Sequence, residues 1–208
     1  MSAALVESSA IDRICAGIAD QGYAVVPEFL PTTAVAALAA DARQREAAGL
    51  FSTARVGRGA ERDAQPDIRG DRILWLDQTS PDTPLHPCWQ ALDVLRTTLN
   101  QTLLLGLFSF EGHYAIYPAG AFYRRHRDRF RHDDARVLSC ALYLNDGWSV
   151  QDGGALRIHF ENGTRRDVLP TGGTLVCFLS ERFEHEVLPA TRERLALTGW
   201  FRRRAMPV

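Results

Sequence analysis

The chain is 208 residues long, enough for one domain that buries a hydrophobic core without disulfides. Its composition, 46% hydrophobic and 24% charged with a formal net charge of -1, argues against a general polyanion binder. All of its basic side chains are arginine, so a bound anion must be held by arginine, hydroxyl groups or backbone amides.

The cysteines and the N-terminus both indicate a cytoplasmic protein. The four cysteines stand apart in the sequence without a Cys-x-x-Cys pair, which favours buried free thiols in a reducing compartment. The first twenty residues lack the charged and apolar regions of a signal peptide, and no apolar stretch approaches the length of a membrane span. We therefore expect a single cytoplasmic domain over residues 1–208 that binds no membrane.

The first half of the chain is mainly helical. Ile11, Ile14 and Ile18 recur at helical spacing before Gly22, and Pro31 opens an alanine-rich segment. A long loop rich in Gly, Arg, Ser and Asp follows, which is typical of a lid or binding loop but also of a disordered hairpin tip. The expected elements are helices over about 11–22, 31–48 and 89–105, strands over 23–29 and 67–76, and the loop over 51–66.

From Phe108 onward, short alternating segments are separated by turn residues. Eight strands after a helical lead predict a mainly β protein with supporting helices, its core a double-stranded β-helix of the jelly-roll or cupin type. The helical support covers about 1–105 and the core about 106–203. The expected strands are 108–117, 121–127, 137–144, 155–160, 165–169, 174–179, 184–188 and 195–202.

His126 and Asp128 are the first candidate metal ligands. Residues two apart in a strand project to the same face, so this imidazole and this carboxylate would lie side by side. A second histidine from a distant strand would complete the 2-His-1-carboxylate triad that holds Fe(II), and His185 is the candidate. Two alternatives stay open: His159 as the third ligand, and the His132–Asp134 triplet in a polar stretch as a competing pair.

The last expected strand carries a candidate anion anchor. Arg194, Thr198 and Trp200 share one face, and a buried arginine needs an anionic partner. That partner is either a ligand or a carboxylate of the protein, such as Glu184 or Glu186.

A turn at residues 189–190 can bring His185 and Arg194 to one cavity from neighbouring strands. A small dicarboxylate could then chelate the metal at one end and meet the guanidinium at the other. 2-Oxoglutarate has that form.

The chain resembles the 2-oxoglutarate- and Fe(II)-dependent prolyl hydroxylases of the hypoxia-inducible-factor type and their bacterial homologues, from about Gly22 to Phe201. The Asp-Ile-Arg-Gly-Asp segment is the motif most specific to this subgroup. The matching segments are 67–71 with Trp75, Tyr117-Pro118, His126-Arg127-Asp128, 142–145, Trp148, 153–158, His185-Glu186-Val187 and 194–200.

The resemblance implies an enzyme that hydroxylates a prolyl residue in a protein loop and forms succinate and CO₂ from 2-oxoglutarate and O₂. It implies roles for three groups of residues. By resemblance, Fe(II) is held by His126, Asp128 and His185. The distal carboxylate of 2-oxoglutarate is bound by Arg194 and Tyr143, while Tyr117 approaches the cofactor near the metal and Thr198 lies behind the residues that contact it. The substrate side is shaped by Arg69, Asp71, Arg136 and Trp200, and the loop over 51–66 forms a lid above it.

The resemblance also implies ascorbate as a candidate auxiliary reductant and elongation factor Tu as a candidate target. The lid sequence departs from the animal enzymes, so their substrate is not carried over. Two other interpretations stay open: an oxygenase of another substrate class, such as a nucleic-acid demethylase, and a metal-binding β-helix module without turnover. Trp200 stands where the demethylases have a second arginine, which favours a protein substrate and no nucleic acid.

Overall fold

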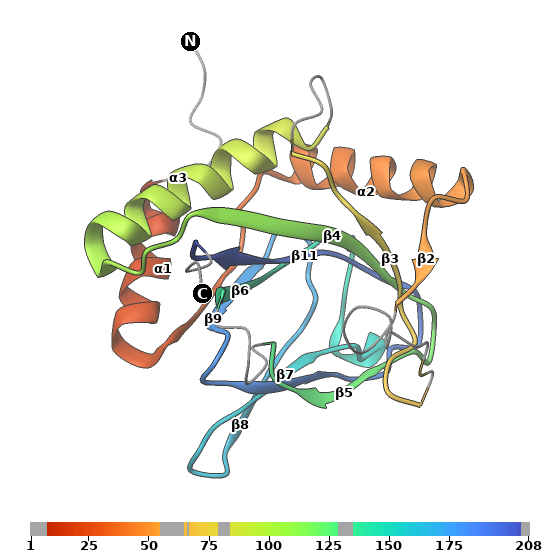
Figure 1. Ribbon diagram of the computed structural model, residues 1–208. Helices are drawn as coiled ribbons and strands as arrows, with labels where there is room; N and C mark the ends of the chain where they lie inside the picture. Colours follow the sequence, from red (N-terminus) through yellow and green to blue (C-terminus); the bar gives the residue numbers. More distant parts are fainter. Residues whose placement is uncertain (1–7, 55–64, 66, 79–83, 129–134, 205–208) are drawn as a thin grey trace.

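Two antiparallel sheets face each other, and the helices lie on the outer face of the larger one (Figure 1). The computed structural model describes residues 8–54, 65, 67–78, 84–128 and 135–204. The helices are α1 (Ser8–Gln21), α2 (Thr32–Ala47) and α3 (His86–Leu103).

The larger sheet has seven strands in the order β1-β9-β6-β11-β4-β3-β2, and the smaller has four in the order β5-β10-β7-β8. Strands of the larger sheet are β1 (Tyr23–Val26), β2 (Ser52–Thr53), β3 (Arg72–Trp75), β4 (Ser109–Tyr117), β6 (Arg136–Tyr143), β9 (Leu175–Leu179) and β11 (Arg194–Arg202). Those of the smaller sheet are β5 (Tyr123–His126), β7 (Leu156–His159), β8 (Arg165–Val168) and β10 (Glu184–Val187).

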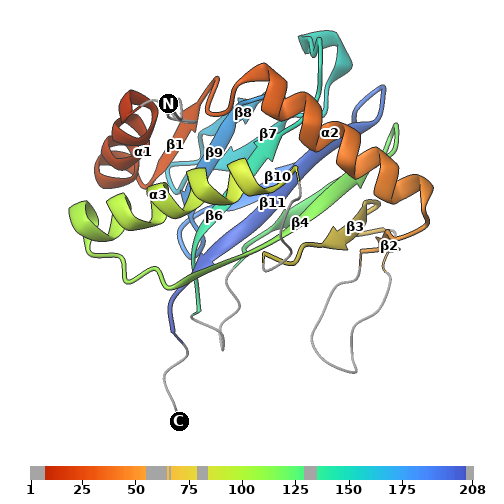
Figure 2. The ribbon, with the colours of Figure 1, turned by 90° about the horizontal axis from the view of Figure 1, so that it is seen from above.

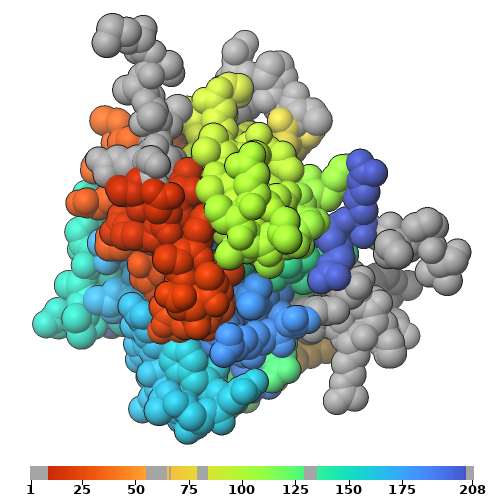
Figure 3. All heavy atoms as spheres, turned by 90° about the vertical axis from the view of Figure 1, so that its left-hand side faces the viewer, coloured from red at the N-terminus to blue at the C-terminus, as the bar shows by residue number. Residues whose placement is uncertain are grey.

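The helices cover the larger sheet because each carries an apolar stripe. Leu92, Leu95 and Leu99 of α3 are buried at spacings of three and four residues, as are Ile14 and Ile18 of α1. Figure 2 shows the helices lying across one face of the sheet, and Figure 3 shows α1 and α3 side by side on the surface. This layer and the inward side chains of β4, β6, β9 and β11 form the main hydrophobic core.

The glycine after α1 ends that helix. Gly22 has a φ of +81°, the left-handed conformation that closes many helices, and its amide donates to the Ile18 carbonyl. A Cβ atom there would lie 2.8 Å from a guanidinium nitrogen of Arg182. Gly22 therefore allows the chain to turn at once into β1.

The mainly β fold and the eight strands after residue 108 are confirmed. Two details differ from expectation: residues 52–53 form a short strand instead of loop, and Asp128, expected in a strand with His126, lies two residues beyond the end of β5. β1 and β3 fall within the strands expected over 23–29 and 67–76, and together with β2 they extend the larger sheet. Most of the expected lid (55–64 and 66) and the His132–Asp134 triplet lie outside the described residues.

Two further observations bear on the sequence analysis. Cys15, Cys88, Cys140 and Cys177 are buried free thiols, as predicted, but Cys140 and Cys177 face each other across β6 and β9 with their sulfur atoms 3.4 Å apart. Among the helices that the structure describes, none combines the length and apolar composition needed to cross a lipid bilayer.

Candidate active site

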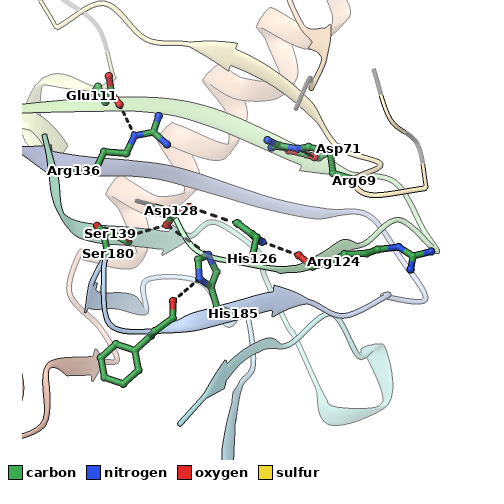
Figure 4. Close-up of polar contacts among 11 residues, drawn as sticks. Arg69, Asp71, Glu111, Arg124, His126, Asp128, Arg136, Ser139, Ser180 and His185 are labelled. Atoms are coloured by element: carbon green, nitrogen blue, oxygen red, sulfur yellow. Dashed lines mark hydrogen bonds and ion pairs between the residues drawn. The ribbon is translucent and has the colours of Figure 1, made fainter. Parts of the chain in front are cut away.

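Three candidate metal ligands meet between the two sheets. His126 ends β5 and pairs in register with His185 on β10, while Asp128 follows two residues after His126. His126 Nε2 lies 3.6 Å from Asp128 Oδ1, and His185 Nε2 lies 3.5 Å from Asp128 Oδ2. The candidate ligand atoms are all within 4.8 Å of one another (Figure 4). The structure thus brings together the triad predicted from the sequence.

A backbone carbonyl two residues earlier orients each histidine. His126 Nδ1 lies 2.7 Å from the Arg124 carbonyl oxygen, and His185 Nδ1 lies 3.4 Å from that of Phe183 (Figure 4). A carbonyl only accepts hydrogen bonds, so Nδ1 carries the proton and the Nε2 lone pair is left free. Both Nε2 atoms point to Asp128, which is the arrangement a metal ion requires.

The pKa shifts favour the protonation states that bind metal. Burial raises the pKa of Asp128, but the nearby His185, with His126 and the Ser139 hydroxyl, outweighs it and holds that pKa well below its usual range. Burial lowers the pKa of His185 to about 4. At neutral pH the site therefore presents an ionised carboxylate and a neutral imidazole, the forms in which these side chains ligate metals.

His159 does not join the cluster. It lies on β7, and its Nε2 is 3.0 Å from Glu186 Oε1. Of the two third ligands left open by the sequence, the structure places His185 at the site.

Arg194 lies in the same cavity, which has a volume of about 340 Å³. It reaches the cavity from β11 in the larger sheet, whereas His185 comes from β10 in the smaller one, so the expectation of neighbouring strands is wrong. The turn between these strands crosses from one sheet to the other. The two side chains face the same space from opposite walls.

The Arg194 guanidinium is buried without a carboxylate partner among the described residues. Only 3% of the residue is exposed, its Nε donates to the Gly154 carbonyl at 3.0 Å, and its Cζ lies 5.1 Å from the ring centres of Tyr117 and Tyr143. The two protein carboxylates considered from the sequence are engaged elsewhere: Glu184 pairs with Arg125, and Glu186 with His159 and Arg157. A buried cation without a carboxylate partner is electrostatically costly, and an anion that enters from outside would offset this cost.

Of the other residues expected at the cofactor, Tyr117 and Tyr143 lie beside Arg194, and Thr198 lies four residues further along β11. Tyr117 and Thr198 line the cavity. Tyr143 is fully buried beside Arg194 and is not on the cavity wall; its hydroxyl makes no hydrogen bond within ordinary geometric limits. Burial raises the pKa of Tyr143 and of Tyr117, so both phenols are neutral donors.

Of the residues expected on the substrate side, Arg69 lines the cavity and Asp71 lies behind it. The Arg69 guanidinium donates to both Asp71 carboxylate oxygens, at 2.6 and 2.8 Å, and lies 4.3 Å from the centre of the Tyr123 ring. Asp71 itself is fully buried. Burial lowers the pKa of Arg69, but the bond to Asp71 outweighs it and raises the pKa above its ordinary value. Asp71 thus orients Arg69 and is not on the cavity wall.

Four side chains that contact one another in a row line one part of the cavity. The Arg136 guanidinium lies 3.5 Å over the Trp200 ring, His113 is 5.6 Å from Trp200 between ring centres, and Trp75 is 4.9 Å from His113. Glu111 holds Arg136 in place with a hydrogen bond of 2.9 Å (Figure 4). We call Arg136, Trp200, His113 and Trp75 the aromatic wall. Arg136 and Trp200 were expected from the sequence and His113 was not, although its alternation with Ala115 and Tyr117 on β4 places it on the cavity face.

Comparisons with known proteins agree with this geometry. The model of the 2OG-Fe(II) oxygenase superfamily matches residues 112–202. A prolyl-4-hydroxylase from Pseudomonas putida is 47% identical in sequence, with a TM-score of 0.84 over 94% of this chain and 100% of that chain. This chain belongs to the 2OG-Fe(II) oxygenase superfamily.

Two animal proteins are also similar to this chain. A Trichoplax adhaerens prolyl hydroxylase, solved in complex with a hypoxia inducible factor oxygen degradation domain peptide fragment, has a TM-score of 0.85 and 25% identity over 92% of this chain and 88% of that chain. Human Egl nine homolog 1 is 29% identical over 205 residues, which cover 92% of this chain and 46% of that protein. This oxygenase spans about half the length of the first curated relatives it matches.

Proposed function

We propose that this oxygenase uses Fe(II), 2-oxoglutarate and O₂ to hydroxylate a prolyl residue in a protein substrate. One observation carries the proposal: the cluster of His126, Asp128 and His185 lines the same cavity as Arg194. Arg194 is buried and has no carboxylate partner among the described residues. A metal ion at the cluster and an anion at Arg194 would together bind a short dicarboxylate.

The residues present fit both groups. Two neutral imidazoles and one carboxylate are the donor set of non-haem Fe(II) oxygenases, which leaves coordination positions open for reactants. At the other end, the Arg194 guanidinium, which has no carboxylate partner among the described residues, offers donors that a carboxylate accepts, and the Tyr143 ring lies beside it. When bound, Fe(II) supplies the oxidation of 2-oxoglutarate by O₂ to succinate and CO₂, with the second oxygen atom inserted into a substrate C–H bond.

The chain itself contributes placement and exclusion of water. Arg194 binds the dicarboxylate, with Tyr143 buried beside its guanidinium, and the carbonyls of Arg124 and Phe183 keep the two imidazoles turned toward the metal. The aromatic wall lines the same cavity as the metal cluster and presents the flat faces of two indole rings, one imidazole and one guanidinium. Such surfaces suit a pyrrolidine ring and keep water from the reacting carbon.

Support for proline comes from the aromatic wall and from the prolyl hydroxylases among the relatives, in particular the one from Pseudomonas putida. We propose elongation factor Tu as the first protein to test, a cytoplasmic location, and ascorbate as an auxiliary reductant. The target and the reductant rest on the family resemblance alone, whereas the location rests on the sequence, chiefly on its four isolated cysteines.

The experiment is anaerobic reconstitution with Fe(II) and 2-oxoglutarate, followed by air. Succinate is measured, and elongation factor Tu and whole-cell lysate peptides are searched by mass spectrometry for a prolyl residue heavier by one oxygen atom. His126→Ala should abolish both products because it removes a metal ligand. The matched control His159→Ala, which removes an imidazole outside the cluster, should keep them.

The outcomes separate the parts of the proposal. Succinate without a hydroxylated peptide would keep the oxygenase and reject the prolyl substrate. Hydroxylation of another protein would reject elongation factor Tu alone. Neither product despite bound metal would favour a metal-binding module, and equal activity in His126→Ala would reject the site.

A further inference from the structure

Two buried serine hydroxyls form a chain that ends on the Asp128 carboxylate. Ser139 Oγ donates to Asp128 Oδ2 at 2.7 Å, and Ser180 Oγ lies 2.8 Å from Ser139 Oγ (Figure 4). Ser139 is 2% exposed and Ser180 is fully buried. Neither residue was singled out by the sequence analysis.

The direction of this chain follows from hydrogen-bond chemistry. An ionised carboxylate only accepts hydrogen bonds, and a serine hydroxyl has a single proton to donate. Because the Ser139 proton goes to Asp128, the bond between the serines must use the proton of Ser180. The order is therefore Ser180 to Ser139 to Asp128, and each donor strengthens the next.

Asp128 needs such support because of where it lies. It lies two residues beyond the last residue of β5, so no strand pairing fixes its backbone. Ser139 stands on β6 in the middle of the larger sheet, and the Ser180 amide donates to the Val137 carbonyl on the same strand. The serines thus fasten Asp128 to rigid backbone in the opposite sheet from both histidines.

Ser180 also links the carboxylate to the second histidine. It follows directly after β9, and five residues later the chain reaches His185 on β10. The contacts therefore connect Asp128 on one segment with the turn that leads to His185.

We propose that Ser139 and Ser180 are positioning residues for the metal centre: they hold the Asp128 carboxylate in the orientation that binds the metal and so set metal affinity. This inference rests on the proposed metal site and goes beyond it. Partners that orient metal ligands are worth about 10-fold to 100-fold in metal affinity in other proteins. The competing explanation is that the two hydroxyls only satisfy buried hydrogen-bonding groups in the core and have no effect on metal binding.

The test is the affinity of the metal-free protein for Mn(II), which is measured from the electron paramagnetic resonance signal of the Mn(II) that stays free in solution. Ser139→Ala should weaken binding by about 10-fold to 100-fold. Ser180→Ala should weaken it less, by about 2-fold to 10-fold, because it removes one neutral hydrogen bond in the outer position. Ser139→Thr keeps the hydroxyl and should bind nearly as the wild type does.

Cys177→Ala is the matched control, since it removes one buried heavy atom from the neighbouring strand β9 without touching the carboxylate. It should leave Mn(II) affinity unchanged. Thermal unfolding of each metal-free variant shows that it is folded before binding is measured.

A second measurement distinguishes positioning from a merely structural role. The visible absorption of bound Co(II) reports ligand number and geometry, so Ser139→Ala should change this spectrum and Cys177→Ala should not. Equal Mn(II) affinity and the same Co(II) spectrum in Ser139→Ala and the wild type would overturn the inference and leave the proposed function intact. If the wild type bound neither metal, the proposed function itself would fail.

Discussion

The two faces of β6 and β11 carry different kinds of side chain. Toward the helices, Leu138, Leu142, Leu195, Leu197 and Phe201 are buried in the main hydrophobic core. Toward the cavity, the same strands present Ser139, Ala141, Arg194, Thr198 and Trp200. Successive side chains in a strand point to opposite faces, so one backbone serves both surfaces.

This difference places stability and chemistry on opposite sides of one sheet. The helix-facing side buries hydrocarbon, which stabilises the fold. The cavity side buries Arg194, His113 and Tyr143 with polar atoms left unpaired or uncompensated, which costs folding free energy. Substitutions on the two faces should therefore affect different measurements, even at adjacent residues.

Leu142→Ala should give the largest change in stability. Its side chain is 2% exposed on the helix-facing side, and large-to-small changes at such positions cost about 2–5 kcal/mol of unfolding free energy. The KM for 2-oxoglutarate should stay at the wild-type value. Urea unfolding and succinate kinetics check the two expectations, and a raised KM would contradict the separation of the faces.

His113 should make the cavity side sensitive to acid. Burial lowers the pKa of His113 from 6.5 to about 4; the positive charges of Arg69 and Arg136 add to this shift, and the negative charges of Asp71 and Asp128 oppose it. Protonation then favours the unfolded chain, so stability is complete above pH 6.5 and falls as pH drops toward 4. Once the pH is below 4, the free energy of unfolding has fallen by about 3 kcal/mol, because each unit of pKa shift is worth about 1.36 kcal/mol.

His113→Leu should remove this part of the pH dependence. Urea unfolding of the metal-free protein between neutral and acidic pH measures it, and the exposed His86→Leu is the control. An unchanged pH dependence in His113→Leu would mean that the imidazole is not buried as the structure has it.

Arg194→Gln should separate cofactor binding from stability. Losing charged hydrogen bonds of about 1.5–3 kcal/mol should raise the KM for 2-oxoglutarate by about 10-fold to 100-fold. The metal-free protein should be at least as stable as the wild type, because a buried charge without a carboxylate partner is removed. Arg166→Gln on β8 is the control, and an unchanged KM in Arg194→Gln would contradict the anchor role.

The smallest effect should come from two tyrosines, both fully buried on opposite faces. Tyr143→Phe removes an unpaired hydroxyl, so stability should not fall, but the KM for 2-oxoglutarate should rise about 2-fold to 10-fold. Tyr114→Phe removes a hydrogen bond of 2.9 Å to Asp41 on α2, so it should lose about 1 kcal/mol of stability and keep its KM. The same result in both variants would contradict the division between the faces.

Much of the site could be predicted because its signals are local. His126 and Asp128 are two residues apart, and Arg194, Thr198 and Trp200 alternate along one strand. His113 could have been found in the same way, from its alternation with Tyr117. The Ser139 and Ser180 contact had no such signal, because the two hydroxyls lie 41 residues apart and meet only when β6 and β9 pair.

The sequence by itself determined the mainly β class, the strand order along the chain, the helices and the candidate ligands, because hydrophobic period, turn residues and ligand chemistry are properties of short segments. Only the tertiary structure decided that His185 and Arg194 face each other from different sheets, that Glu184 and Glu186 are paired elsewhere, and that Asp71 lies behind Arg69. These facts depend on which strands pair and on which side chains compete for one partner. Such long-range choices are settled by packing the whole chain at once.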